Sequence, residues 1–175
     1  MYIGKSNEIE SFIDTTFKPK SLEKSQFNTY KLQYKNFKID FAMCRQEVYA
    51  SSASLPLIKE GNLTQDQERR DFTINTLYID TKHFSIDKVI YPYNWLNDIK
   101  LKLIKTLHLN SFSDDPTRIF RAIRYAKRLN FKIDNQTIKQ IEEFRININK
   151  LSGTRIKNEI HKILNENKVI ETIKS

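Results

Sequence analysis

The chain has 175 residues, of which 39% are hydrophobic and 29% charged, with a net charge of +9. That size suits one core, or a core with a small helical annex, and no stretch reaches the ~18 apolar residues of a membrane span. The single cysteine excludes an internal disulfide, and the start lacks the apolar core of a signal peptide, so we expect a cytoplasmic protein. The positive charge favours a polyanionic partner, most commonly nucleic acid.

Two further features of the composition limit the chemistry. The three histidines are scattered without zinc-type spacing, so any metal would be a hard cation on carboxylates, such as Mg²⁺. Three glycines in the whole chain argue against a glycine-rich phosphate loop.

The first 50 residues predict a helix followed by a β-hairpin. Apolar residues over 7–17 have the spacing of a short amphipathic helix. Alternating runs at 30–34 and 37–41 flank Lys35-Asn36, a pattern typical of a hairpin. In the second run Ile39 and Phe41 share one face, so Asp40 is expected to point away from the apolar side.

The middle of the chain predicts mixed structure and the remainder predicts helices. We expect a loop over 51–65, because it contains Pro56, Gly61 and several serines, and a helical segment over 67–77. Possible strands follow at 77–79 and 86–90, and beyond Pro92 the pattern is helical with short breaks. Strands in the first half and helices in the second predict an α+β fold with an all-α second part.

The predicted helix over 67–77 carries a polar cluster. Asn75 follows Asp71 by four residues and Arg70 by five, so all three side chains could reach one side of a helix. As a surface ion-pair cluster these residues would contribute about a kcal/mol or less. As a binding site they would offer a carboxylate and an amide to ribose hydroxyls and an arginine to a phosphate. The residues alone favour the structural interpretation.

A second polar cluster begins at a predicted helix start. Asp115 as N-cap and Pro116 at the first helical position are ordinary capping chemistry. At about 100° per residue, Arg118, Arg121 and Arg124 fall within roughly 120° of the helix surface, and the apolar residues gather on another arc. The segment alone could be structural, but three adjacent guanidiniums also suit an anion such as a nucleoside triphosphate.

Five groups of residues occur in a specific order between about residues 9 and 164. They are Asp40-Phe41-Ala42 with Arg45 and Glu47; Asp66 with the run Arg69 to Asn75; Leu107-His108 with Ser111-Phe112; Asp114 to Arg118 with Arg121 and Arg124; and Ser152 with Arg155 and Glu159. Their order and spacing resemble the class II tRNA nucleotidyltransferases, the CCA-adding and A-adding enzymes, and the related bacterial poly(A) polymerases. The succession of the Arg-Arg-Asp-Phe-Thr-Ile-Asn run and the Asp-Pro-Thr-Arg run makes the resemblance specific.

The resemblance implies both an architecture and a reaction. It implies part of a nucleotidyltransferase head over residues 1–103, with a mixed or antiparallel sheet and helices. A helical neck over residues 104–175 would recognise the nucleotide and bind RNA. The reaction would be template-independent transfer of CMP or AMP from CTP or ATP to the 3′-hydroxyl of tRNA or another RNA. These residues do not separate CCA addition from A addition or poly(A) synthesis.

The resemblance also implies how the base would be read. Asp115 and Arg118 would contact its Watson–Crick edge, and this pair suits C and A and disfavours G and U. A carboxylate that caps a helix is less free for a base, so Asp114 would cap the helix instead.

The remaining nucleotide contacts follow from the same resemblance. The residues that would hold the triphosphate are Arg70, Arg121 and Arg124. Those that would meet the ribose hydroxyls are Asp71 and Asn75.

Three other residues would support catalysis. Asp40 matches the third acidic position of the catalytic site, near Mg²⁺. Arg155 and Glu159 form an i,i+4 pair that would support the nucleotide-binding helices, with Ser152 capping their own helix.

Two motifs of these enzymes do not occur in the sequence. One is the Asp-x-Asp pair that chiefly holds the catalytic metals, and the other is the Gly-Gly…Arg-Asp segment that precedes it. Because Asp40 alone cannot hold two Mg²⁺ ions, we expect the isolated chain to bind nucleotide but to be inactive alone. Three explanations stay open: Met1 is internal to a longer protein, an upstream polypeptide carries the motif, or the chain is a non-catalytic remnant that binds nucleotide or RNA.

Two loops also depart from the pattern of these enzymes. Residues 91–95 stand where the enzymes often have Asp-Pro-x-x-Gly, and Phe27-Asn28-Thr29 stands in place of Phe-Gly-Thr. Asn tolerates a positive φ better than most residues, whereas Trp does not. The resemblance therefore does not fix the backbone geometry of these two loops.

Overall fold

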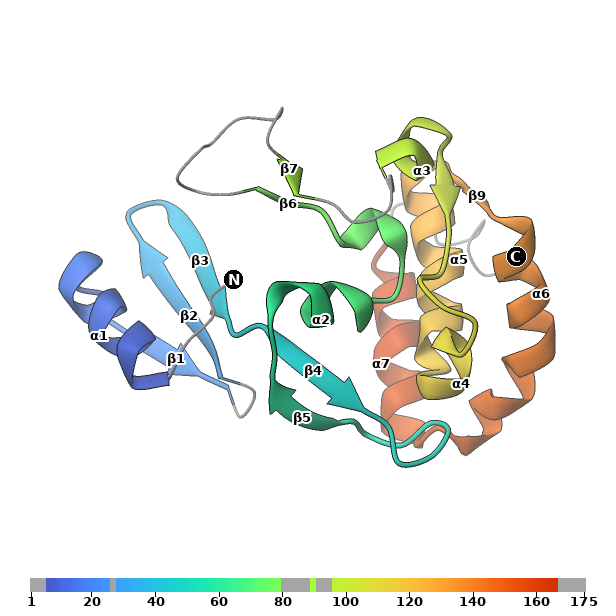
Figure 1. Ribbon diagram of the computed structural model, residues 1–175, viewed down its shortest axis with the longest axis horizontal. Coiled ribbons are helices and arrows are strands. Elements are labelled where there is room, and N and C mark those ends of the chain that lie inside the picture. The colour runs from blue at the N-terminus through green and yellow to red at the C-terminus, as the bar shows by residue number, and fades with distance from the viewer. Residues whose placement is uncertain (1–5, 26–27, 80–88, 91–95, 167–175) are drawn as a thin grey trace. The chain divides into compact units, whose positions relative to one another are not determined.

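The computed structural model describes residues 6–25, 28–79, 89–90 and 96–166 (Figure 1). The chain divides into two compact units, residues 1–48 with 57–69 and residues 49–56 with 70–175. Strands and helices in both units confirm the α+β fold. The expected boundary between a head over 1–103 and a neck over 104–175 stays a prediction. Within the described ranges, none of the helices has the length and apolar character needed to cross a membrane.

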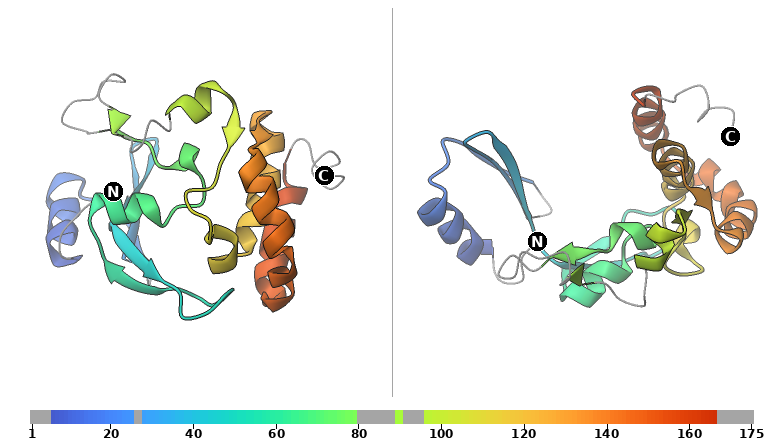
Figure 2. Two further views of the ribbon diagram at one scale, coloured as in Figure 1. Left: turned by 45° about the vertical axis from the view of Figure 1, so that its right-hand side comes forward. Right: turned by 90° about the horizontal axis from the view of Figure 1, so that it is seen from above.

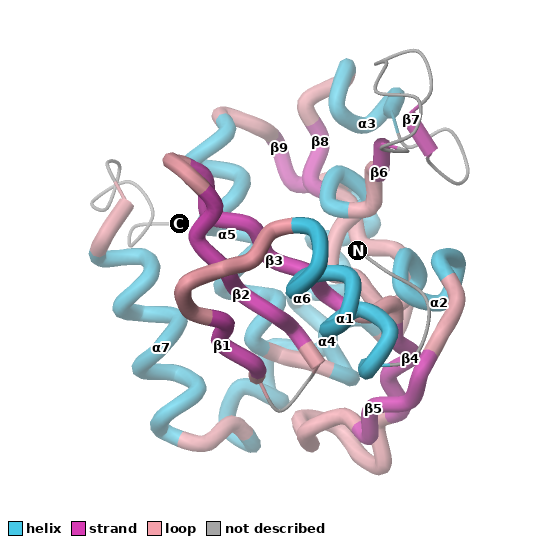
Figure 3. The backbone as a smooth tube through the Cα atoms, turned by 90° about the vertical axis from the view of Figure 1, so that its left-hand side faces the viewer, coloured by secondary structure: helices cyan, strands magenta, loops and turns pink. Residues whose placement is uncertain are grey.

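The first unit is built on a three-stranded sheet. Its elements are α1 (Ser6–Thr16), β1 (Leu22–Lys24), β2 (Thr29–Tyr34), β3 (Phe37–Ala42), β4 (Arg45–Val48), β5 (Leu57–Glu60) and α2 (Leu63–Glu68). The antiparallel order is β1-β2-β3, as Figure 3 shows. Ile9 and Ile13 of α1 pack on Tyr30 and Leu32 of β2. The predicted helix and hairpin are therefore confirmed.

Positive φ angles occur where the hairpin and one loop require them. Lys35 has φ 52° in the two-residue turn between β2 and β3, and Asn28 has φ 52° before β2. The second value agrees with the tolerance of asparagine for a positive φ. Phe27 and residues 91–95 lie outside the described residues, as do residues 80–88.

The prediction of a loop over 51–65 is wrong for its second half, which contains a strand and the start of a helix. β5 pairs with β4 in an antiparallel hairpin, and α2 begins at Leu63. Asn62 forms a capping box with Gln65, whose backbone N–H donates to Asn62 Oδ1 at 2.9 Å. A four-residue strand has too few positions for its alternation to stand out, so its pairing partner decides the structure.

The second unit contains most of the helices. Its elements are η1 (Thr73–Asn75), β6 (Tyr78–Ile79), β7 (Val89–Ile90), α3 (Leu96–Lys100), β8 (Leu103–Ile104), α4 (Ser111–Asp114), α5 (Thr117–Leu129), β9 (Lys132–Ile133), α6 (Asn135–Phe144), η4 (Arg145–Lys150) and α7 (Gly153–Leu164). A buried cluster that includes Phe72, Ile104 and Phe112 packs on Ile119 and Ala122 of α5. Helices α5 and α7 pack together (Figure 2).

Two expectations for this unit need correction. The helix predicted over 67–77 is wrong: α2 ends at Glu68, and Phe72 forms a β-bridge with Thr106. The N–H of Thr73 donates to the carbonyl of Lys105 at 2.9 Å, so a distant segment takes the backbone groups that a helix would need. The expectation of helices alone after Pro92 also misses β8 and β9, a short parallel pair. The strand predicted near 77–79 appears as β6, and β7 is the described end, residues 89–90, of the strand predicted over 86–90.

Candidate functional site

An ion pair joins the two polar clusters singled out in the sequence. Nε of Arg121 on α5 donates to Oδ2 of Asp71 at 2.7 Å, across 50 residues of chain, and Nη2 of Arg121 contacts the same oxygen. Oδ1 of Asp71 accepts from the N–H of Phe72 at 2.9 Å and from Nδ2 of Asn75 at 2.8 Å. Asp71 and Asn75 therefore reach each other as expected, through a 3₁₀ turn in place of an α-helix.

The Asp71–Arg121 pair is strongly ionised. Burial acts to raise the pKa of Asp71, but the charge of Arg121 and the hydrogen bonds from Asn75, Arg121 and Phe72 outweigh it and hold that pKa below its usual range. For Arg121, burial acts to lower the pKa, and the opposite charge of Asp71 raises it above its usual value. A carboxylate has about four acceptor positions, and three N–H groups already donate to Asp71, with Nη2 of Arg121 in contact as well.

Three arginines of α5 surround one aromatic ring. The guanidiniums of Arg121, Arg124 and Arg128 lie 5.3, 4.8 and 4.7 Å from the ring centroid of Tyr125. Nη1 of Arg124 donates to Oε1 of Glu166 at 3.1 Å, and Arg128 lies 3.7 Å from the same oxygen. Arg124 is 7% exposed, and its buried Nε has no hydrogen-bond partner among the described residues. The surface of α5 thus concentrates positive charge.

The start of α5 is held by Asp115. Its backbone is extended, while Pro116 has helical angles of φ −61° and ψ −16°. Oδ1 of Asp115 accepts from the N–H and hydroxyl of Thr117 at 3.0 and 2.6 Å. Asp115 therefore caps the first turn of α5, as first expected. Capping by Asp114 is wrong, because the N–H of Thr117 donates to Asp115, and the carboxylate of Asp114 lies instead 4.0 Å from Nε2 of His108. In the described part of the chain, no group donates to Oδ2 of Asp115.

Arg118 is the second residue of α5 and lies beside other polar groups. It is 5% exposed, and its Nη1 donates to Oγ of Ser111 at 2.8 Å. Burial lowers the pKa of His108, and the charge of Arg118 lowers it further, so His108 is neutral at pH 7. Burial also raises the pKa of Asp114. The guanidinium of Arg118 therefore lies close enough to the Asp114 carboxyl to oppose this rise in pKa.

Arg155 and Glu159 bind different partners. Ser152 caps α7, as expected, by accepting from the N–H of Arg155. Nη2 of Arg155 donates to Oδ1 of Asp115 at 2.6 Å, whereas Glu159 pairs with Lys162 at 2.6 Å. Arg155 therefore holds the start of α5 directly.

Arg70 belongs to the same unit as α5. Its guanidinium lies 5.6 Å from the ring centroid of Tyr78. Asp40 belongs to the first unit, where it is exposed on β3 on the face away from Ile39 and Phe41, as expected.

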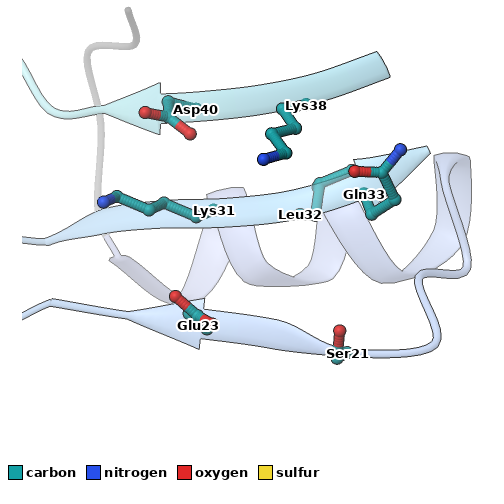
Figure 4. Close-up of a pocket in the computed structure, with 7 residues that line it drawn as sticks. All are labelled: Ser21, Glu23, Lys31, Leu32, Gln33, Lys38 and Asp40. Atoms are coloured by element: carbon teal, nitrogen blue, oxygen red, sulfur yellow. The ribbon is translucent and has the colours of Figure 1, made fainter. Parts of the chain in front are cut away.

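Asp40 lies beside a shallow hollow on the open face of the sheet (Figure 4). In strand register it is directly opposite Lys31, which is in turn opposite Glu23 on β1. Lys38 lines the same hollow. Among the residues the structure describes, no three His, Cys, Asp or Glu side chains are close enough together to hold a metal ion. Two carboxylates, Asp40 and Glu23, that share the hollow with two lysines do not fit a site for Mg²⁺.

A second ion-pair network orders the first unit. Oε1 of Glu47 accepts from Nη2 of Arg45 at 2.7 Å and from Nη1 of Arg69 at 3.2 Å. Oδ1 of the fully buried Asp66 accepts from Nε of Arg69 at 2.9 Å and from the N–H of Arg45 at 3.2 Å. These contacts tie α2 to β4.

Reasoning from the sequence missed three participants of the arginine cluster. Arg128 continues the arc of Arg124 one turn further along α5, so helical periodicity was the signal that could have found it. Tyr125 follows Arg124 directly, and nothing in its spacing marks it. Glu166 lies 42 residues from Arg124, and no local pattern predicts that contact.

Two family models match the chain. The poly A polymerase head domain matches residues 3–105, and the probable RNA and SrmB-binding site of polymerase A matches residues 130–175. The A-adding tRNA nucleotidyltransferase of Aquifex aeolicus is 36% identical over 151 residues, which cover 85% of this chain and 18% of that protein. The CCA-adding enzyme of Staphylococcus epidermidis is 31% identical over 165 residues, which cover 93% of this chain and 40% of that protein. The chain therefore spans less than half the length of these curated relatives.

Solved structures show the same likeness. A CCA-adding enzyme in apo form II superposes with a TM-score of 0.86 at 31% identity, covering 98% of this chain and 41% of that chain. A tRNA nucleotidyltransferase complexed with a primer tRNA and an incoming ATP analog gives a TM-score of 0.80 at 30% identity, covering 98% of this chain and 48% of that chain.

Proposed function

Because this chain belongs to the family of class II tRNA nucleotidyltransferases and poly(A) polymerases, we propose that its second unit selects the nucleotide for adding C or A to RNA 3′ ends. The substrates are CTP or ATP and the 3′-hydroxyl of tRNA or another RNA. The cytoplasmic location expected from the sequence remains a prediction.

The pair between Asp71 and Arg121 is the observation that carries this proposal. It connects the run from Arg70 to Asn75 with α5, so that groups suited to ribose and to phosphate lie in one place. The seven residues expected to bind nucleotide all belong to the second unit. Scattered surface ion pairs would not bring both clusters together.

Base recognition is assigned to Asp115 and Arg118. Asp115 uses Oδ1 for Thr117 and Arg155, which leaves Oδ2 to accept from the exocyclic amine of C or A. Capping and base contact are therefore compatible, and Asp114 is not needed as a cap. Arg118 would donate to a ring nitrogen or carbonyl oxygen of the same base.

Phosphate binding is assigned to Arg70, Arg121 and Arg124, since guanidiniums form paired charge-assisted hydrogen bonds to phosphate oxygens. The buried Nε of Arg124 is one N–H group that such an oxygen would satisfy. Asn75 and Asp71 would meet the ribose, and a hydroxyl that bonds to Asp71 has to share an oxygen with Arg121 or Asn75.

We assign most of the carboxylates that bind Mg²⁺ to residues outside the described ones. Asp40 remains our candidate for one catalytic carboxylate, but its lysine neighbours do not complete a site for Mg²⁺. We propose that a polypeptide segment with an Asp-x-Asp pair is the partner that supplies the other carboxylates. The isolated chain with CTP, Mg²⁺ and a tRNA lacking its CCA end should then show no incorporation. Incorporation by the isolated chain would refute this part.

Binding experiments test nucleotide selection directly. Calorimetric titration of the chain should show binding of CTP and ATP in preference to GTP and UTP. Arg118→Ala should weaken CTP binding by about tenfold, the effect of losing ~1.4 kcal/mol of contacts. Asp115→Asn keeps a capping oxygen but replaces one acceptor with a donor, so it should lower the preference for CTP and ATP.

Asp134→Asn is the matched control. Asp134 caps α6 by accepting from the N–H groups of Gln136 and Thr137, so this variant changes the cap of a helix that carries none of the proposed nucleotide-binding residues. It should bind all four nucleotides as the wild type does. Nucleotide affinities that are unchanged by both Arg118→Ala and Asp115→Asn would contradict the proposed function.

A further inference from the structure

We propose that Ser111 is a positioning residue that sets base selectivity by orienting Arg118, an inference that rests on the proposed function of the same site. Ser111 is the first residue of α4 and is fully buried. No base contact is assigned to it, so its effect has to pass through its neighbours.

Ser111 contacts both residues assigned to base recognition. Its Oγ accepts from Nη1 of Arg118 at 2.8 Å, and its carbonyl accepts from the N–H of Asp115 at 3.2 Å. The N–H of Ser111 itself donates to the carbonyl of His108 at 3.3 Å. One buried residue therefore links the guanidinium and the carboxylate-bearing backbone that would face the base.

The hydroxyl matters because a guanidinium is a planar fork. Its N–H groups point in fixed directions, so a bond to one nitrogen sets where the others point. Arg118 is 5% exposed, and the buried hydroxyl holds Nη1 from the inner side of the unit. The bond to Ser111 therefore helps to set the direction in which the remaining N–H groups of Arg118 meet the atoms of a base edge.

The charges around Arg118 favour a neutral group for orienting its guanidinium. Asp114 and Asp115 supply negative charge near Arg118, and His108 carries none at pH 7 because burial and Arg118 both lower its pKa. A carboxylate in place of Ser111 would add a further charge beside the base. A hydroxyl orients the guanidinium without that charge.

The test separates base reading from phosphate binding. Wild type, Ser111→Ala and Arg118→Ala are titrated with CTP, ATP and GTP, and with inorganic tripolyphosphate, which has no base. Ser111→Ala should weaken the binding of CTP and ATP by about 3- to 10-fold, the range expected for the loss of one hydrogen bond. GTP and tripolyphosphate binding should stay within about twofold, so the ratio of CTP to GTP affinity falls.

Two further variants separate positioning from a structural role. Ser113→Ala removes a hydroxyl from the same helix and should keep the wild-type affinities, since only the carbonyl of Ser113 is hydrogen-bonded in the described structure. Ser111→Cys keeps the size and a weak acceptor and should restore part of the selectivity. It also serves as the test variant if Ser111→Ala does not fold.

Three results would overturn the inference. The first is a CTP-to-GTP ratio that falls in Arg118→Ala but not in Ser111→Ala. The second is an equal loss of CTP and tripolyphosphate binding in Ser111→Ala, which would show that Ser111 only supports the unit. The third is an unchanged ratio in Arg118→Ala, which would refute the proposed base recognition itself, and this inference with it.

Discussion

Replacing Arg121 with alanine would leave a buried carboxylate without its cation. Asp71 is 6% exposed and accepts from Nε of Arg121 at 2.7 Å. Removing one partner of a buried ion pair destabilises a protein by about 3–5 kcal/mol. The side chain of Arg121 is 30% exposed, and Asn75 and the N–H of Phe72 still bond to Asp71. We therefore expect the lower end, a loss of about 3 kcal/mol in the free energy of unfolding.

The loss should depend on pH with a defined sign. In the wild type the folded-state pKa of Asp71 lies below the value of about 3.9 in the unfolded chain. Its contribution is therefore fully present above pH ~3.9 and disappears as the pH falls through the lower folded-state pKa. In Arg121→Ala, burial raises the pKa of Asp71, so this variant gains stability as the pH falls. The difference between the two proteins should shrink toward acid pH.

Urea unfolding followed by far-ultraviolet circular dichroism measures both effects. The cycle of Arg121→Ala, Asp71→Asn and the double variant should give a coupling energy of about 0.5–3 kcal/mol at neutral pH. Arg128→Ala is the matched control, because Arg128 is on the same helix, is 47% exposed and lies 3.7 Å from Glu166. Arg128→Ala should lower the free energy of unfolding by less than about 1 kcal/mol. Additive effects in the cycle, or equal losses for Arg121→Ala and Arg128→Ala, would refute the argument.

Two further substitutions give expectations of opposite sign. A Cβ at Gly61 would lie 2.8 Å from the backbone carbon of Arg45, so Gly61→Ala should lower the unfolding free energy by about 1–3 kcal/mol. At Gly153 a Cβ meets nothing within 4 Å, so Gly153→Ala in α7 should raise the unfolding free energy by up to about 1 kcal/mol, measured by the same urea unfolding. On the proposal that Arg124 binds phosphate, Glu166 competes for it, and Glu166→Gln should tighten tripolyphosphate binding about 2- to 5-fold by calorimetry. Weaker binding would show that the carboxylate only supports Arg124.

The candidate site shows where local reasoning was sufficient. The arc of Arg118, Arg121 and Arg124 follows from helical periodicity, and α5 indeed spans these positions. The cap at Ser152 and the orientation of Asp40 away from the sheet core were predicted in the same way. Each depends on residues a few positions apart, whose geometry the backbone period largely sets.

The helix predicted over 67–77 shows where reasoning from neighbouring residues was not sufficient. Thr73 pairs its N–H with Lys105, and this contact across more than 30 residues replaces the expected helical bonds. Arg155 similarly reaches Asp115, 40 residues away, and not the neighbour at i+4. Hydrogen-bonding groups take the partner that the packed chain offers, and that partner is invisible to a local pattern.

Composition and periodicity were enough to predict the α+β fold, and the motifs of the sequence carried the resemblance to the family and to its candidate residues. Only the tertiary structure decided how those residues are used. It pairs Asp71 with Arg121 and hydrogen-bonds Ser111 to Arg118. It also uses Oδ1 of Asp115 for the helix cap and leaves Oδ2 without a donor among the described residues. The physical reason is that periodicity sets the direction of a side chain along its own element, whereas burial and pairing depend on segments that meet only when the chain folds.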